Sequence, residues 1–255
     1  MKNPLKEQLL KGEAAFGTWQ MTTSYDTSLI LSSVGADCIM IDQEHGSMDL
    51  EKVGVMVSLI QKTNTVPLVR VPWHDMALIK RALDTGAGGI MIPMVNDKET
   101  AERVVSYCKY PPEGVRGVGA GRAALYFSGG GDPDYIKNAN KNILVILQIE
   151  HHSAVKNLEE ILSVPGIDVA FVGPVDLSYS MNIMGEVDHP EVQANIEKIA
   201  TTCKKYNVAS GIFASESNMQ TYYDMGYRLF LGGIDAAFIY QGASSLLKTF
   251  KDLKR

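Results

Sequence analysis

The sequence predicts a single (β/α)8 TIM barrel, and three observations lead to this fold class. The chain has 255 residues, so the predicted domain spans 1–255, a length that α/β barrels commonly reach as one domain. Eight short runs are apolar at almost every position, which indicates strands of a parallel sheet covered on both faces. Segments with helical periodicity separate these runs, so strand and helix alternate as the barrel requires.

The predicted strands end at polar or glycine-containing turns. An open doubly wound sheet usually has fewer strands and a phosphate-binding fingerprint in its first turn. The glycines of "GVGAGRAAL" follow a helix and a Pro-Pro break instead of a strand, so they do not supply that fingerprint. The closed barrel is therefore favoured, with strands at 14–20, 37–42, 67–72, 88–95, 143–150, 168–173, 208–213 and 227–233.

The intervening segments carry helix start and stop signals. Ser47 is predicted to begin the helix that follows the second strand, and Asp75 the next one, with Gly86 as its stop. Asn96 and Glu99 resemble a capping box. Further helices are predicted from Pro190 to Tyr206 and at 153–163, 215–225 and 235–252.

Composition excludes several classes of function. The formal net charge is -5, and no Lys/Arg cluster is suited to a phosphate backbone, so nucleic acid is not an expected partner. No apolar run approaches the ~20 residues that span a bilayer, and we expect no membrane contact and a cytoplasmic protein. Cys38, Cys108 and Cys203 are far apart in apolar segments, so we predict reduced core residues.

One connection is too long for a simple turn. Residues 111–142 separate a predicted helix from the fifth strand, and a connection of this length tends to be functional or to contain short helices. The glycine run Gly129–Gly131 is compatible with a lid, with a contact to another subunit, or with a surface loop that has no function.

Unusual polar residues collect at the predicted carboxyl ends of the strands. In a barrel these ends meet at one mouth, where active sites form. A random scatter of charged residues would fall mostly on helix surfaces. The set comprises Asp42, Glu44 and His45 after the second strand, Arg70 on the third, Gln148 and Glu150 on the fifth, and Asp176 after the sixth.

Glu150 and Asp176 follow adjacent strands and are suited to share a divalent cation. Two carboxylates and water suit a hard cation such as Mg²⁺ or Mn²⁺, and they leave positions for a chelating substrate. The alternative is that each carboxylate caps the helix that follows it. No lysine stands at a strand end, since Lys80 and Lys98 belong to helices, and this disfavours a Schiff-base aldolase.

Arg70 on an apolar strand needs an anionic or carbonyl partner, either a substrate or a structural ion pair. His45 and Asp42 suggest a general base and its orienting carboxylate. A hydrogen-bonded histidine in a polar turn is the alternative.

Taken together, the motifs resemble the HpcH/HpaI family of class II pyruvate-dependent aldolases over nearly the whole chain. Seven motifs in the same order are far more specific than any one of them. They are "FGTW" at 16–19, "DQEHG" at 42–46, "VRVP" at 69–72, "IPMV" at 92–95, "YPPEGVRGVG" at 110–119, "LQIE" at 147–150 and "FVGPVDLS" at 171–178.

The resemblance implies a role for each candidate residue. Glu150 and Asp176 match the ligands of a divalent metal (Mg²⁺, Mn²⁺ or Co²⁺), and His45 matches the catalytic base with Asp42 beside it. Arg70 matches the residue on the keto oxygen. The implied reaction is the reversible cleavage of a 4-hydroxy-2-oxo acid into pyruvate and an aldehyde through a metal-bound pyruvate enolate.

Further implications concern the substrate and the assembly. Gln148 matches a polar contact to pyruvate, and the backbone at Gly173, Pro174 and Val175 matches the surroundings of its carboxylate. The resemblance also implies a homo-oligomer, namely a hexamer whose C-terminal helix is exchanged between subunits. An eighth helix packed on its own chain is the alternative.

One departure from the family pattern and two alternative functions remain to be considered. His151 and His152 stand where family members often have Thr, and we expect them to begin the next helix or to support the ligands rather than bind the metal. The related citrate lyase β-subunit and malyl-CoA lyase type is the enzymatic alternative, although no basic cluster for CoA phosphates is evident. A barrel that only binds a ligand is the non-enzymatic alternative.

Overall fold

The computed structural model describes residues 2–119, 121–124 and 134–253. Eight parallel strands form a closed barrel in chain order, which confirms the predicted fold class. All eight predicted strands are present, with ends that differ by at most three residues. They are β1 (Ala15–Gln20), β2 (Cys38–Asp42), β3 (Val66–Arg70), β4 (Gly89–Ile92), β5 (Leu144–Ile149), β6 (Val169–Val172), β7 (Ala209–Phe213) and β8 (Leu229–Ile234).

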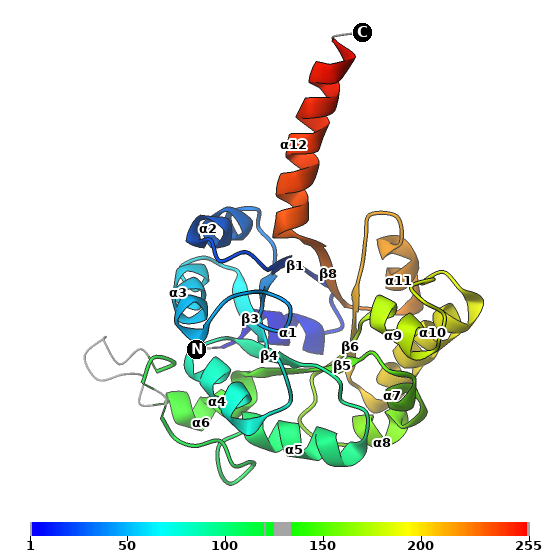
Figure 1. Cartoon of the computed structure of the whole chain (residues 1–255). Helices are drawn as coiled ribbons and strands as arrows, with labels where there is room; N and C mark the ends of the chain where they lie inside the picture. The colour runs from blue at the N-terminus through cyan, green and yellow to red at the C-terminus, as the bar shows by residue number, and fades with distance from the viewer. Residues whose placement is uncertain (1, 120, 125–133, 254–255) are drawn as a thin grey trace.

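Helices surround the barrel, and Figure 1 looks approximately along its axis into the carboxyl ends of the strands. One short helix, α1, lies behind the barrel in this view, and the last helix, α12, leaves it sideways. The helices are α1 (Pro4–Leu10), α2 (Tyr25–Ser33), α3 (Leu50–Ile60), α4 (Met76–Asp84), α5 (Lys98–Cys108), α6 (Tyr135–Asn142), α7 (His152–Lys156), α8 (Leu158–Leu162), α9 (Pro174–Ser180), α10 (Pro190–Tyr206), α11 (Met219–Met225) and α12 (Asp235–Asp252).

Two hydrophobic clusters divide the side chains of the strands. The larger one packs the strands against the surrounding helices, and the smaller one fills the barrel interior, where Leu5 and Leu9 of α1 close the amino-terminal end. Because side chains alternate along a strand, every second residue points inward. The inner cluster accordingly contains Cys38 and Met40 of β2, Val66 and Leu68 of β3, and Leu144 and Ile146 of β5.

Some predicted helix boundaries are confirmed. Asp75 caps α4 by accepting from the backbone amides of Ala77 and Leu78, and Gly86 follows that helix with a positive φ of 97°. Pro190 is the first residue of α10.

Other boundaries were wrong by one to several residues. Asp49, not Ser47, caps α3, and Asp97, not Asn96, caps α5. In each case a carboxylate nearer the helix accepts its free amides, which a side chain further away cannot reach. The helix predicted at 153–163 is interrupted at Asn157, and the one predicted at 215–225 begins at Met219.

The long connection contains a helix of its own, as one of its readings predicted, because α6 occupies residues 135–142. The predicted lid or contact at Gly129–Gly131 lies outside the described residues. Cys38, Cys108 and Cys203 are buried free thiols, as predicted.

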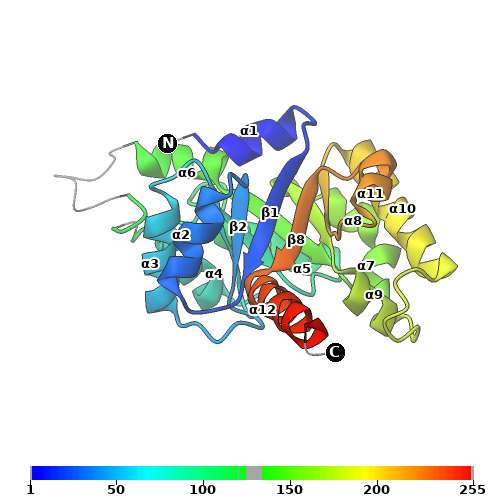
Figure 2. The ribbon, with the colours of Figure 1, turned by 90° about the horizontal axis from the view of Figure 1, so that it is seen from above.

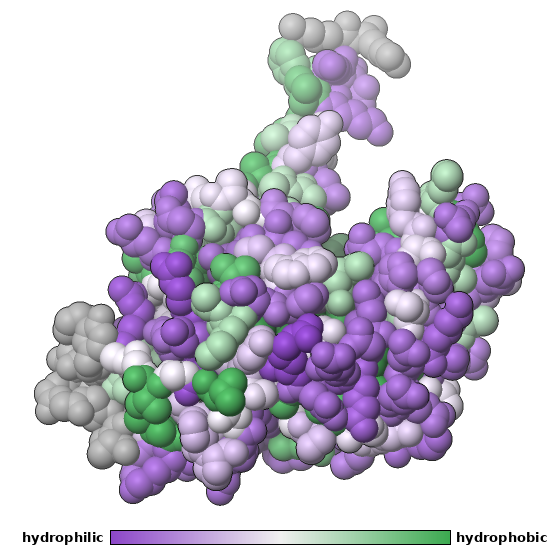
Figure 3. All heavy atoms as spheres, turned by 60° about the horizontal axis from the view of Figure 1, so that its bottom comes forward, coloured by the Kyte–Doolittle hydropathy of each residue, from purple (hydrophilic) through white to green (hydrophobic). Residues whose placement is uncertain are grey.

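The last helix does not pack along its own barrel. Figure 1 shows α12 leaving the barrel, and Figure 3 shows apolar side chains along one side of it. Its base is held firmly, since the buried Asp235 carboxylate accepts from the amides of Met21 and Thr22. This geometry rules out the alternative of an eighth helix packed on its own chain. In the described part of the chain, no helix is long and apolar enough to cross a membrane.

Candidate active site

The polar residues predicted at the strand ends gather inside one end of the barrel. Asp42, Arg70 and Gln148 each stand two residues beyond an inward-facing apolar residue of the same strand, so they continue the interior layers towards the mouth. All three are buried. The alternating pattern that fills the barrel with apolar groups therefore ends in a layer of polar ones.

Arg70 is held from three sides. Its Nε donates to Asp42 Oδ1 at 2.8 Å, its Nη2 donates to Asp42 Oδ2 at 2.6 Å, and its Nη1 lies 3.0 Å from Glu44 Oε2. Its guanidinium carbon lies 4.4 Å from the ring centre of Trp19, a cation–π distance. These contacts fix one orientation of the guanidinium at the mouth.

His45 lies in a different contact from the one predicted. Asp42 Oδ1 accepts from the backbone amides of Glu44 and His45, not from the imidazole. The nearest carboxylate to the ring is Glu44, with 3.9 Å between Glu44 Oε2 and His45 Nε2. Asp42 pairs with Arg70 instead, so the predicted contact between Asp42 and the imidazole was wrong. The side chain of His45 is 61% exposed and accessible to a substrate.

The Glu150 carboxylate is buried and held by two hydrogen bonds. Glu150 Oε1 accepts from the backbone amide of Met94 at 2.9 Å, and Oε2 accepts from Gln148 Nε2 at 2.7 Å. Met94 has a positive φ of 55°, which is uncommon outside glycine. Burial, together with the charges of Glu44 and Asp176, raises the pKa of Glu150 to about 7. Three acidic groups close together favour the presence of a cation.

Asp176 belongs to the first turn of α9, beside Glu150. A Cβ placed on Gly173, which precedes this helix, would lie 3.1 Å from Glu150 Oε2 and 3.3 Å from Asp176 Oδ2. The two carboxylates therefore border one small space that exists only because residue 173 has no side chain. Pro174 is the first residue of α9, and Val175 next to it is exposed.

This pair fits a hard divalent cation as a partial ligand set. Carboxylate oxygens are the ligands that Mg²⁺ and Mn²⁺ prefer, and these ions keep several waters or substrate oxygens. Among residues 2–119, 121–124 and 134–253, no group of three or more His, Cys, Asp or Glu side chains is arranged as a complete metal site. No backbone amide of α9 donates a capping hydrogen bond to a side chain, which disfavours the alternative of a capping role for Asp176.

The two histidines after Glu150 support the helices around the site. His151 caps α7, since its Nδ1 accepts from the amide of Ser153. His152 Nδ1 lies 2.8 Å from the carbonyl oxygen of Ser180, at the end of α9. Both positions agree with the predicted helix-entry or supporting role.

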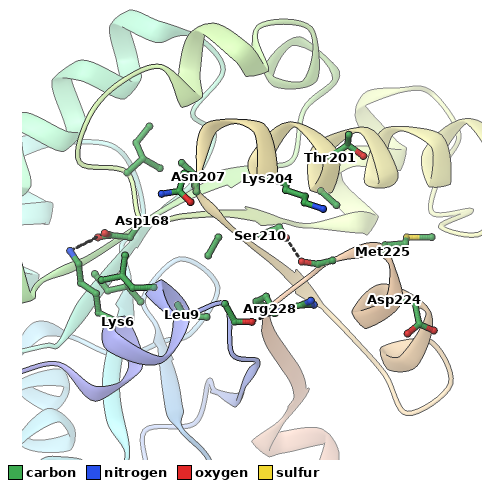
Figure 4. A pocket seen from close by; sticks show the side chains of 18 residues that line it. Lys6, Leu9, Asp168, Thr201, Lys204, Asn207, Ser210, Asp224, Met225 and Arg228 are labelled. Atoms are coloured by element: carbon green, nitrogen blue, oxygen red, sulfur yellow. Dashed lines mark hydrogen bonds and ion pairs between the residues drawn. The ribbon is translucent and has the colours of Figure 1, made fainter.

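One cavity lies away from these polar residues. It has a volume of about 600 Å³ and is bordered by residues that precede β5 to β8 and by α1, at the amino-terminal end of the barrel (Figure 4). Its floor contains Lys6 and Asp168, which pair with each other at 2.8 Å and also bond backbone groups. The charges of Lys6 and Asp168 therefore satisfy one another within the structure.

The arrangement at the mouth can be compared with known proteins. The family model described as HpcH/HpaI aldolase/citrate lyase matches residues 16–241. The chain belongs to this family. The HpcH/HpaI relatives include a protein from Salmonella dublin named 4-hydroxy-2-oxo-heptane-1,7-dioate aldolase, which is 37% identical over 98% of this chain and 95% of its own length. Membership and this full-length similarity identify the chain as a carbon–carbon lyase.

Solved HpcH/HpaI structures have the same architecture. An aldolase/citrate lyase family protein from Burkholderia cenocepacia is 32% identical, with a TM-score of 0.93 over 98% of this chain and 100% of that one. An HpcH/HpaI aldolase from Desulfitobacterium hafniense is also 32% identical, with a TM-score of 0.90 over 97% and 96% of the two chains. The predicted resemblance to the family is thus confirmed.

Sequence reasoning missed two contributors to the HpcH/HpaI site of this chain. Trp19 lies in a motif that was recognised, and its place at the end of the first strand was a usable signal for contact with Arg70. Met94 also lies in a recognised motif, but its side chain gave no indication of its role, because it acts through its backbone amide and an unusual φ angle.

Proposed function

We propose that this chain is a divalent-metal-dependent aldolase that reversibly cleaves a 4-hydroxy-2-oxo acid into pyruvate and an aldehyde. The observation that carries the proposal is the pair of carboxylates, Glu150 and Asp176, around the space at Gly173. The relative named 4-hydroxy-2-oxo-heptane-1,7-dioate aldolase supports the substrate class, since it is similar over nearly its whole length. The natural aldehyde defines the individual enzyme within this class.

Glu150 and Asp176 would hold the cation, which we propose to be Mg²⁺, Mn²⁺ or Co²⁺. When bound there, such an ion supplies positive charge to the substrate oxygens and favours negative charge on them. Gln148 and Met94 keep the Glu150 carboxylate in one position by donating to its two oxygens. The protein thereby presents preformed ligands, so binding needs little reorganisation.

Arg70 stabilises negative charge on the keto oxygen of the substrate. Negative charge develops on that oxygen when the bond between C3 and C4 breaks and its electrons form the enolate of pyruvate. Asp42 and Glu44 fix the guanidinium before the reaction begins. A preorganised donor of this kind contributes roughly 10²- to 10³-fold in rate.

His45 acts as the base. It takes the proton of the C4 hydroxyl as the C4–O bond becomes the carbonyl of the departing aldehyde. Its exposed imidazole can reach such a hydroxyl, directly or through water, and the Glu44 carboxylate lies 3.9 Å from its Nε2. In the direction of synthesis, the same imidazole returns the proton.

The substrate carboxylate lies, in this proposal, against the backbone at Gly173, Pro174 and Val175. The first amides of a helix have no intrahelical acceptors and are free for an anion. Gln148 contributes a polar contact, and its buried Oε1 has no partner among the described residues. The layer of polar residues at the barrel mouth would therefore contact the 2-oxo acid as well as hold the cation.

We also propose a cytoplasmic homo-oligomer, a hexamer in which α12 packs on a neighbouring subunit. Apolar side chains of α12 that would otherwise face water support this assembly. Tyr240 is 74% exposed, Leu246 76% and Leu247 51%, and exposed apolar patches of this kind usually mark interfaces.

The proposal is tested by supplying the purified protein, first stripped of metal, with Mg²⁺, Mn²⁺ or Co²⁺ and a panel of 4-hydroxy-2-oxo acids. Pyruvate release that requires the added ion is the expected result. No release with any ion would contradict the proposal, and a pyruvate adduct trapped by borohydride would indicate a Schiff base instead. Activity confined to a CoA thioester would favour the malyl-CoA lyase type.

A further inference from the structure

The two proposed metal ligands are held in very different ways. Glu150 is buried and accepts two hydrogen bonds, from Met94 and Gln148. Asp176 is exposed, and none of the described residues donates a hydrogen bond to its carboxylate. The position of the Asp176 carboxylate therefore depends on where the helix α9 lies.

α9 is a short helix whose two ends are fixed by different neighbours. Its start follows β6 directly, and β6 pairs with β5 in the register Ile149 to Val172. Its last residue, Ser180, is fixed by His152. The backbone amide of His152 donates to Ser180 Oγ at 2.9 Å, and His152 Nδ1 lies 2.8 Å from the Ser180 carbonyl oxygen.

The contact with a carbonyl oxygen determines which nitrogen of the His152 imidazole carries a hydrogen. A carbonyl oxygen only accepts, so His152 Nδ1 must carry a hydrogen and donate it. His152 stands two residues after Glu150, and Ser180 stands one helical turn after Asp176. The two bonds thus join the segment of one carboxylate to the helix of the other.

We propose that His152 is a positioning residue that sets the separation of the Glu150 and Asp176 carboxylates by holding the end of α9. This inference rests on the proposed function, because it assumes that the two carboxylates share a cation. Some residues orient metal ligands without touching the metal themselves. Removing such a residue typically weakens metal binding roughly 10- to 100-fold.

The test measures Mn²⁺ affinity by electron paramagnetic resonance, without substrate, in three variants. His152→Leu removes the Nδ1 donor, whereas His152→Asn keeps an N–H donor at nearly the same place. Ser180→Ala removes Oγ, which accepts from the backbone amide of His152, and this variant remains informative if the Leu variant does not fold. His189→Leu is the control, because His189 caps α10 through its Nδ1 and has no contact with the two carboxylates.

We expect His152→Leu to bind Mn²⁺ at least ~10-fold more weakly than the wild type, and His152→Asn and the control to bind as the wild type does. The Leu variant should regain its kcat at saturating Mn²⁺. Unchanged Mn²⁺ affinity in His152→Leu, with or without a lower Tm, would overturn the inference and leave a purely structural role. Equal losses in the Asn and Leu variants would also overturn it. Failure of the wild type itself to bind Mn²⁺ would instead refute the proposed metal site.

Discussion

Asp42 and Arg70 are register partners on the neighbouring strands β2 and β3, and their side chains form two hydrogen bonds, at 2.8 and 2.6 Å, inside the barrel. Asp42 is fully buried, and the side chain of Arg70 is 10% exposed. The pairing leaves Asp42 unavailable to the His45 ring. It also makes the arginine proposed to act on the substrate part of the core of the protein.

Asp42→Asn should lower both stability and activity, because it leaves a buried guanidinium with only Glu44 as an anionic partner. We expect the free energy of unfolding to fall by about 3 kcal/mol, at the low end of the range for a broken buried ion pair. Urea denaturation measures this change. Asp49→Asn, at an exposed helix cap where Asn serves as well as Asp, should change it little. Similar values for the two variants would show that the Asp42–Arg70 pair does not contribute to stability.

Gly173→Ala should remove metal binding without unfolding the protein. The φ of Gly173 is -94°, which alanine adopts readily, but the added Cβ would lie 3.1 Å from Glu150 Oε2 and 3.3 Å from Asp176 Oδ2. The methyl group thus occupies the space between the carboxylates, and we expect at least a ~10-fold loss of Mn²⁺ affinity. Gly119→Ala, whose Cβ would meet no atom within 4 Å, is the matched control. Normal Mn²⁺ binding by Gly173→Ala would place the cation elsewhere.

Met94→Ile should destabilise the protein and weaken the hold on Glu150, whereas Met94→Gly should not. The φ of Met94 is 55°, a region that β-branched residues avoid and glycine adopts freely. Strain of this kind costs roughly 1–3 kcal/mol, so we expect the unfolding free energies of the Ile and Gly variants to differ by about that amount. Denaturation and Mn²⁺ titration check both effects. An Ile variant that behaves as the wild type in both would contradict the role of the Met94 amide.

Leu246→Asp should reduce the size of the assembly, because a charge would stand in the surface that α12 offers to a neighbouring subunit. Light scattering coupled to gel filtration measures the mass. Leu10→Asp is the control, since Leu10 of α1 is 73% exposed and Leu246 is 76% exposed. Wild-type protein that runs as a monomer, or a Leu246→Asp protein of unchanged mass, would contradict the proposed packing of α12.

The barrel, its eight strands and the polar residues at its mouth were predictable from the order of residues alone. Strands buried on both faces need near-continuous apolar runs, and this is a local property of the chain. The predicted helix starts differed from the observed ones by a few residues, as at Asp49 and Asp97. Neighbouring polar residues can cap the same free backbone amides, so the pattern alone does not select one of them. The family motifs were local as well, and they identified the candidate residues before any contact was known.

The pairing of these residues became known only from the folded arrangement of the strands and helices. Whether the Asp42 carboxylate pairs with the imidazole of His45 or with the guanidinium of Arg70 depends on the register between β2 and β3. This register places Asp42 directly opposite Arg70. The hold of Met94 on Glu150 depends on a backbone angle, and the departure of α12 from the barrel depends on how Asp235 is anchored. Such contacts join segments far apart in the chain, and their energies follow from burial and geometry that no local pattern of residues encodes.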